Sequence, residues 1–305
     1  MRNLKLMVTG LALAGLAGCG TAYAAASPSA SWVAPSSSPT ATSAATSAET
    51  SVPASPSSEA PSPEAPAAPS SEAPAAPSSE APTPSSEAPS SSPAAAHHGG
   101  PANSLMKTGT KDVALTFDDG PDPVQTPALL DLLGEQGIKA TFCLVGQQAA
   151  AHPDLVRRIV EEGHTLCNHS WNHSLTLGKG SPAAIRKDLQ KTNDAIHAAV
   201  PDAEIKYMRA PGGNFTPALV KAASDLGMTS IYWDLDPRDW DHPAGETDAT
   251  HTARVISTVK KHTTKGAIIL SHDYGQPDTI KAYRTLIPWL KTRFTLIALP
   301  VDNAL

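Results

Sequence analysis

Two short segments hold side chains that could together bind a divalent metal ion and activate water. The segment TFDDGP (residues 116–121) sets two adjacent carboxylates after an apolar run, and HSWNH (residues 169–173) carries two histidines four positions apart. One carboxylate oxygen and two imidazole nitrogens form the three-ligand set of a catalytic zinc site, which keeps its fourth position open for water. The pattern therefore indicates metal-assisted hydrolysis.

These segments must be brought together by the elements that precede them. Residues 113–117 are apolar and β-branched, and Gly120-Pro121 interrupts them, so the aspartates should follow a parallel strand, where sites in α/β folds gather. The i, i+4 spacing of the histidines predicts a helical turn that points both rings the same way. Either pair alone is also typical of a solvated turn or a surface helix, and it is their joint occurrence that favours a site.

Three further segments extend the pattern: RAPG (residues 209–212), DPRDW (236–240) and LSHD (270–273). In this order, the five segments resemble the motifs of the polysaccharide deacetylases, carbohydrate esterase family 4, from about residue 110 to the C-terminus. The resemblance implies a distorted (β/α)7 barrel and a metal-dependent hydrolase that removes acetyl groups from a polysaccharide.

The resemblance also implies a role for individual residues. Asp119, His169 and His173 match the ligands of one divalent metal ion. Zinc suits two imidazoles and a carboxylate, and cobalt, nickel or manganese could occupy the same ligands. Asp118 matches the general base, and Arg209 matches the residue that orients this base through a guanidinium fork.

On the other side of the scissile bond, His272 matches the general acid. Asp239 matches the carboxylate that pairs with this histidine and raises its pKa, because the field of the metal would otherwise favour the neutral ring. Asp273, directly after the acid, is expected to cap a loop.

The remaining implied positions line the substrate groove. The backbone amide of Gly212 matches the oxyanion donor, and Trp240 and Leu270 match apolar residues around the acetyl methyl group. Many relatives carry an aromatic residue after the proline of this motif, whereas this chain has glycine there. The main-chain donor survives that change, but one wall of the groove is expected to be missing.

Cys143 and Cys167 fall on two predicted strands, 139–145 and 165–168, just before catalytic loops. Disulfides persist in exported proteins, so we expect a bond between these cysteines. Two buried apolar thiols are the alternative.

The N-terminus predicts export. Residues 1–19 combine Arg2 and Lys5 with an apolar run too short to span a bilayer, which is typical of a secretory signal. The run ends in Leu-Ala-Gly-Cys, which resembles a bacterial lipobox, so Cys19 is expected to carry the lipid. The chain would then be anchored to the outer face of the bacterial cytoplasmic membrane and face the cell wall. An ordinary signal peptide cleaved near residues 24–26 is the alternative.

Residues 20–108 are assigned to a linker. Up to about Ala96 they consist of Ala, Pro, Ser and Thr with recurrent Ser-Ser-Glu-Ala-Pro units, and a segment so poor in large apolar residues is expected to be disordered. Its six glutamates and the two cations of the leader account for most of the net charge of −6. The segment 109–305 is therefore nearly neutral, which gives no support to nucleic-acid binding.

The segment 109–305 is long enough for one α/β domain with a sizeable core. Strand-like runs alternate with helix-like segments, and several of the latter begin at proline and end at glycine. This alternation predicts a parallel sheet or barrel. The expected strands are 113–117, 139–145, 165–168, 205–209, 228–233, 266–271 and 294–299, and the expected helices are 127–136, 153–162, 182–200, 217–226, 247–262 and 277–293.

The anchor and the linker favour a cell-wall substrate, that is, N-acetylglucosamine units of peptidoglycan or chitin. An acetylxylan esterase is the alternative within the enzyme class, and a glycan-binding lipoprotein that has lost the reaction is the alternative outside it. A monomer is expected. Eight histidines show no partner pattern and are expected to be surface or packing residues: His97, His98, His152, His164, His197, His242, His251 and His262.

Overall fold

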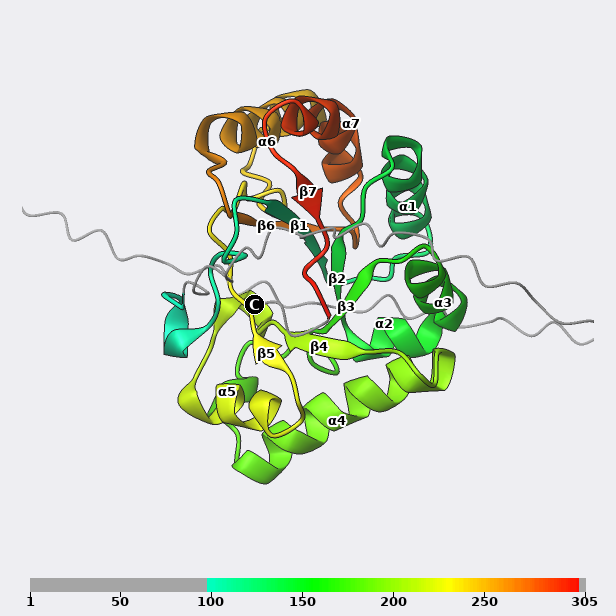
Figure 1. The fold of residues 1–305 in the computed structure, drawn as a ribbon, viewed down its shortest axis with the longest axis vertical. Helices are drawn as coiled ribbons and strands as arrows, with labels where there is room; N and C mark the ends of the chain where they lie inside the picture. Colours follow the sequence, from blue (N-terminus) through cyan, green and yellow to red (C-terminus); the bar gives the residue numbers. More distant parts are fainter. Residues whose placement is uncertain (1–97, 302–305) are drawn as a thin grey trace, which may run out of the picture. The chain divides into compact units, whose positions relative to one another are not determined.

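The computed structural model describes residues 98–301, so the predictions for the leader, Cys19 and most of the linker lie outside the described residues. The described part holds seven strands and seven α-helices (Figure 1). The strands are β1 (Val113–Asp118), β2 (Thr141–Leu144), β3 (Thr165–Asn168), β4 (Ile205–Met208), β5 (Thr229–Ser230), β6 (Ile268–His272) and β7 (Leu296–Ile297). The helices are α1 (Gln125–Gln136), α2 (Gly146–Ala151), α3 (Pro153–Glu161), α4 (Pro182–Ala199), α5 (Pro217–Ser224), α6 (Asp248–His262) and α7 (Pro277–Lys291), with 3-10 turns η1 (Pro101–Asn103), η2 (Leu177–Lys179) and η3 (Pro211–Gly213).

The strands form one curled parallel sheet with helices packed outside it. Its order is β5-β4-β3-β2-β1-β6, and β7 pairs with the beginning of β1. In Figure 1, α6 and α7 lie at the β6 and β7 end of the sheet, and α4 and α5 lie at the β4 and β5 end. The prediction of an α/β fold with a distorted barrel of seven strands is thereby confirmed as a curled half-barrel.

The beginning of the domain lies earlier than the boundary predicted at residue 109. Leu105 is buried and pairs with Ile231 beyond β5, while Lys107 pairs with Ala267 before β6. This segment therefore runs between the two ends of the sheet, as a bridge that hydrogen-bonds to both. The amino-acid composition did not reveal this segment, because its paired stretches are single residues and their partners are remote in sequence.

The helix starts agree with the proline pattern, and side-chain caps explain why. Ser181 and Thr216 each precede a proline, and their hydroxyls accept hydrogen bonds from backbone N–H groups of α4 and α5. Thr247 forms a capping box with Thr250 at the start of α6. The short helix α2 was not predicted, and only Thr229–Ser230 of the run 228–233 is a strand.

Alternation along the strands separates two apolar cores. Leu115 and Phe117 of β1 pack with the helices outside the sheet, whereas Ala114 packs with the residues inside the curl. Since successive side chains of a strand point to opposite faces, Asp118 continues the inward row that begins at Ala114. The same count on β6 places His272 inward with Ile268. Within residues 98–301, no helix has the length and apolarity that a membrane crossing requires.

Candidate active site

The catalytic carboxylate and the catalytic imidazole predicted from the sequence lie on neighbouring strands. Asp118 ends β1 and His272 ends β6, and the two residues are register partners in the parallel ladder. Both belong to inward rows at the carboxyl end of the sheet. The sheet alone therefore brings together two segments more than 150 residues apart in sequence.

The three predicted metal ligands converge at this end of the sheet. Oδ1 of Asp119 lies 3.4 Å from Nε2 of His169 and 3.3 Å from Nε2 of His173. His169 is buried, and its Nδ1 lies 2.9 Å from the carbonyl of Arg209, so the proton of a neutral ring resides on Nδ1 and the lone pair on Nε2. That nitrogen faces the carboxylate.

The backbone around the trio differs from the expected helical turn. Residues 169–173 form an irregular loop after β3, with φ of 65° at Ser170 and 54° at His173, and Asp119 has φ of 77°. Residues other than glycine seldom adopt this region. The prediction of a helical turn was therefore wrong, since the two rings converge through left-handed residues instead of through helical spacing.

The trio fits a divalent cation. Ligands about 2.0 to 2.1 Å from a tetrahedral zinc ion lie about 3.3 Å apart, close to the separations of 3.3 and 3.4 Å found here. Oδ1 of Asp119 is buried and accepts no hydrogen bond. A buried carboxylate oxygen without a donor is costly, and a cation at this point would compensate it.

Arg209 holds Asp118 from inside the domain. Its Nη1 donates to Oδ1 of Asp118 at 2.7 Å and to Oγ1 of Thr116 at 2.8 Å, and its Nη2 donates to the carbonyl of Tyr232 at 2.9 Å. The guanidinium is completely buried. Because it is fixed by three acceptors, it leaves Oδ2 of Asp118 facing the metal trio, 3.5 Å from Nε2 of His169.

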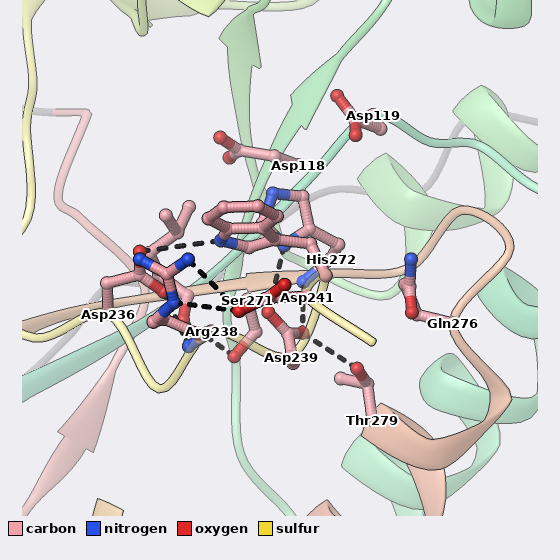
Figure 2. Close-up of polar contacts among 12 residues, drawn as sticks. Asp118, Asp119, Asp236, Arg238, Asp239, Asp241, Ser271, His272, Gln276 and Thr279 are labelled. Atoms are coloured by element: carbon pink, nitrogen blue, oxygen red, sulfur yellow. Dashed lines mark hydrogen bonds and ion pairs between the residues drawn. The ribbon is translucent and has the colours of Figure 1, made fainter. Parts of the chain in front are cut away.

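Figure 2 shows the acid side of the site, where Asp239 forms hydrogen bonds with His272 below Asp118 and Asp119. Oδ1 of Asp239 is 2.9 Å from Nδ1 of His272, and its Oδ2 accepts the backbone N–H of the same residue at 2.8 Å. Thr279, in the first turn of α7, donates its hydroxyl to Oδ2 at 2.7 Å. Asp239 is fully buried, so its charge acts on the imidazole with little screening.

The residues predicted to line the groove, Gly212, Leu270 and Trp240, follow β4, belong to β6 and follow Asp239, respectively. Gly212 lies after β4 with φ of 60°, a backbone conformation that favours glycine. Leu270 is buried on the inward row of β6, two positions before His272. Trp240 is 44 % exposed, and its ring contacts Asp236 and Arg238 of the same loop.

Two aromatic side chains from the segment after β5 pack against the second of the glycines that follow Pro211. A Cβ at Gly213 would come within 2.8 Å of both Tyr232 and Trp233, whose rings stack with centroids 3.8 Å apart. This glycine pair thus admits aromatic side chains from the segment after β5.

The pKa values of Asp119 and His272 are shifted in opposite directions, and each shift favours the charged form. Burial alone would raise the pKa of Asp119, but its contacts with His169 and His173 hold that pKa below the ordinary value. Burial alone would lower the pKa of His272, but the charge and hydrogen bond of Asp239, with help from Asp118 and Asp119, raise it to about 10. His272 is therefore a protonated donor at neutral pH in the metal-free protein.

Cys143 and Cys167 are joined by a disulfide. They are direct register partners on β2 and β3, and both side chains belong to the core inside the curl. The bond links β2 to β3, and the loop that follows β3 includes the two histidines predicted as metal ligands.

Two site residues have no signal in the sequence that identifies them. Thr279 donates to Asp239 from 40 residues further along the chain, and a threonine after Pro277-Asp278 is an ordinary helix start. Asp273 is not a loop cap. It is completely buried, receives the hydroxyl of Thr126 at 2.5 Å, and burial together with the nearby carboxylates raises its pKa to about 7.

The sequence of this chain is similar to those of several known proteins. A sequence profile described as polysaccharide deacetylase matches residues 106–231. A chitooligosaccharide deacetylase of a Bradyrhizobium species is 36 % identical over 207 residues, which cover 63 % of this chain and 91 % of that protein. The chain belongs to the polysaccharide deacetylase family. A peptidoglycan-N-acetylglucosamine deacetylase of Bacillus cereus is 35 % identical over 185 residues, 59 % of this chain and 82 % of that protein.

As a member of this family, the chain is a hydrolase, a polysaccharide deacetylase. One solved structure shows why the fold alone is not sufficient evidence of activity. A family 4 carbohydrate esterase pseudoenzyme from Bacillus anthracis has a TM-score of 0.57 at 28 % identity, and the match covers 64 % of this chain and 66 % of that chain. In the present chain, every residue type expected of the metal trio, the base and the acid is in place.

Proposed function

We propose that this deacetylase is metal-dependent and removes the acetyl group from N-acetylglucosamine units of peptidoglycan or of chitin-like glycans. The observation that carries the proposal is the convergence of Asp119, His169 and His173 beside a base and an acid on adjacent strand ends. Two relatives are named as deacetylases of chitooligosaccharides and of peptidoglycan N-acetylglucosamine, and these names support the substrate class.

The residues divide the reaction between them. A divalent cation held by the trio would lower the pKa of water and polarise the acetyl carbonyl. Asp118 accepts the proton of the attacking water, and Arg209 keeps the base oriented toward the cation site. The N–H of Gly212 lies in the loop after β4, where it can donate to the carbonyl oxygen as negative charge develops.

Departure of the amine requires a proton, and His272 supplies it. Asp239 keeps the ring protonated and fixes its orientation through Nδ1, so Nε2 is the nitrogen that donates. Leu270 and Trp240 bound the space beside the acid and offer apolar contact to the acetyl methyl group. The base and the acid thus act from two neighbouring strands.

Two substitutions test the assignment of roles. Asp118→Asn should abolish acetate release while the bound metal is retained, whereas His169→Ala should lose the metal. Metal content is measured on the same samples as turnover. Unchanged turnover in either variant would remove that residue from the mechanism.

The substrate is tested by acetate release from N-acetylglucosamine oligomers, peptidoglycan and acetylxylan under the same conditions. We expect release from the first two. Activity on acetylxylan alone would overturn the choice and favour an esterase. Zinc is the proposed ion, and metal analysis of protein purified without added metal identifies it.

We further propose that the chain is exported and anchored through a lipid on Cys19, with residues 20–97 as a tether that lets the domain reach the surrounding wall polymer. A proline-rich tether of this length extends to at most about 230 Å. The support is the sequence pattern of the leader and the linker. Partition of the wild type into detergent, lost in Cys19→Ser, would test it, and equal partition of both proteins would contradict it. The expected monomer stays a prediction.

A further inference from the structure

A second group of metal-ligating side chains lies outside the catalytic centre. Residues 98–301 hold two groups whose possible ligand atoms all lie within 4.8 Å of one another. One is the catalytic trio, and the other consists of His242, His251 and Asp278. His242 belongs to the loop that carries Asp239, His251 to the first turn of α6, and Asp278 to the first turn of α7. The group therefore joins three segments that meet beside the active site.

The spacing of this group resembles that of the catalytic trio. Nδ1 of His251 lies 3.1 Å from Oδ2 of Asp278, compared with about 3.3 Å between two ligands of a tetrahedral zinc ion. The rings of His242 and His251 have centroids 3.9 Å apart. The two rings are tilted by 36° to each other, and one ligand atom from each of the three residues lies within 4.8 Å of the others.

The two buried members of the group place one ring nitrogen and one carboxylate oxygen next to each other. His251 is completely buried, and its Nε2 has no hydrogen-bond partner, an uncommon and costly state. Asp278 is 2 % exposed; Lys281 occupies its Oδ1 at 2.7 Å, which leaves Oδ2 to the histidine. Nδ1, the nitrogen of His251 that faces the carboxylate, is therefore the one that would bind a cation, and Nε2 would carry the proton of the ring.

The third side chain is oriented as metal-ligating histidines usually are. Nε2 of His242 lies 2.9 Å from Oε1 of Gln276, an amide oxygen that only accepts. The proton of the ring therefore resides on Nε2, and Nδ1 carries the lone pair. A hydrogen bond to the far nitrogen fixes the tautomer and the ring plane, as outer partners of metal ligands do.

We propose that His242, His251 and Asp278 bind a second divalent cation of the zinc class. It would tie the loop of residues 232–247 to the first turns of α6 and α7. Thr279, next to Asp278, donates the hydrogen bond that holds Asp239. The cation would thus steady the support of the catalytic acid without touching the reacting atoms.

The experiment counts zinc in the full protein. Metal is removed with a chelator, zinc is added in excess, unbound zinc is removed, and zinc is measured per chain. We expect two ions in the wild type, one in His242→Ala, one in His173→Ala and none in the double variant. His262→Ala, which changes an exposed histidine at the other end of α6, should keep two.

The outcome separates this proposal from the catalytic one. His242 is exposed, so its removal is compatible with folding, and circular dichroism checks that it is. Zinc content that is the same in His242→Ala, His262→Ala and the wild type would overturn the second site. Loss of zinc in His173→Ala tests only the catalytic trio and leaves the second site unaffected.

Discussion

Asp239→Asn isolates the charge that keeps the catalytic acid protonated. In the structure, that charge overcomes burial and contributes to a pKa of His272 of about 10, against an ordinary 6.5. The imidazole is only 12 % exposed, so the difference corresponds to about 5 kcal/mol in favour of the charged ring. The carboxylates of Asp118 and Asp119 supply part of this, and a bound cation would offset their part.

Without Asp239, burial acts on the ring with less opposition, and the pKa of His272 should fall to 6.5 or below. About 3 % of the rings would then be protonated at pH 8. We therefore expect kcat/KM at pH 8 to drop by at least about thirtyfold, and the alkaline limb of the pH profile to move down by about two units or more. Part of the activity should return as the pH is lowered.

The assay is acetate release from N-acetylglucosamine oligomers across the pH range, with metal content measured at each pH. Asp241→Asn is the matched control, since Asp241 lies two positions further on the same loop and pairs with Arg238 instead of the acid (Figure 2). Thr279→Val keeps the charge of Asp239 and removes one donor. If the alkaline limb of Asp239→Asn coincides with that of the wild type, Asp239 does not act through the pKa of His272.

The other predictions concern stability and the base. Replacing Cys143 and Cys167 by serine should lower the free energy of unfolding by about 3.5 kcal/mol for a separation of 24 residues, measured by denaturant titration; an unchanged midpoint would show that the bond contributes nothing. Burial lowers the pKa of His164 from 6.5 to about 4. The neutral ring therefore makes its whole contribution to the free energy of unfolding above pH 6.5, and this free energy should fall by up to about 3 kcal/mol as the pH is lowered toward 4. His164→Gln should lose this slope, and a slope that persists refutes the assignment. Arg209→Lys keeps the charge beside Asp118 but removes the second nitrogen, which donates to the carbonyl of Tyr232, so kcat/KM should fall by about tenfold to a hundredfold, whereas wild-type activity would contradict its positioning role.

The sequence predicted those parts of the fold that depend on local pattern. Alternating apolar runs located all seven strands, and Ser-Pro and Thr-Pro starts located α4 and α5, because a cap and a proline act within one turn. It missed α2 and the segment around Leu105. Both are short, and their positions depend on partners elsewhere in the chain, such as Ile231.

The same limit applies to the site. The motif residues that the sequence named are gathered at one end of the sheet, because parallel strands present their ends together. The i, i+4 interpretation of His169 and His173 failed, since a left-handed residue produces the same convergence without a helix. Thr279 belongs to the site because it contacts Asp239, and Asp273 is buried in contact with Thr126. Residue type alone does not predict such contacts.

Four of the six non-glycine residues with positive φ among residues 98–301 lie in loops of the site, and the other two, Ala102 and Asn103, lie in η1. Asp119, Ser170, His173 and Arg238 all have positive φ, and each lies in a loop that supplies a ligand or supports the acid. Such conformations cost about 1 to 3 kcal/mol each and persist only where neighbours fix them. Here hydrogen bonds within the loops provide that restraint, for example the bond from the Ser170 N–H to the side chain of Asn168 at 2.9 Å. A metal ion shared by the first and third of these residues would stabilise the same conformations, so metal binding and backbone strain at this site should be coupled.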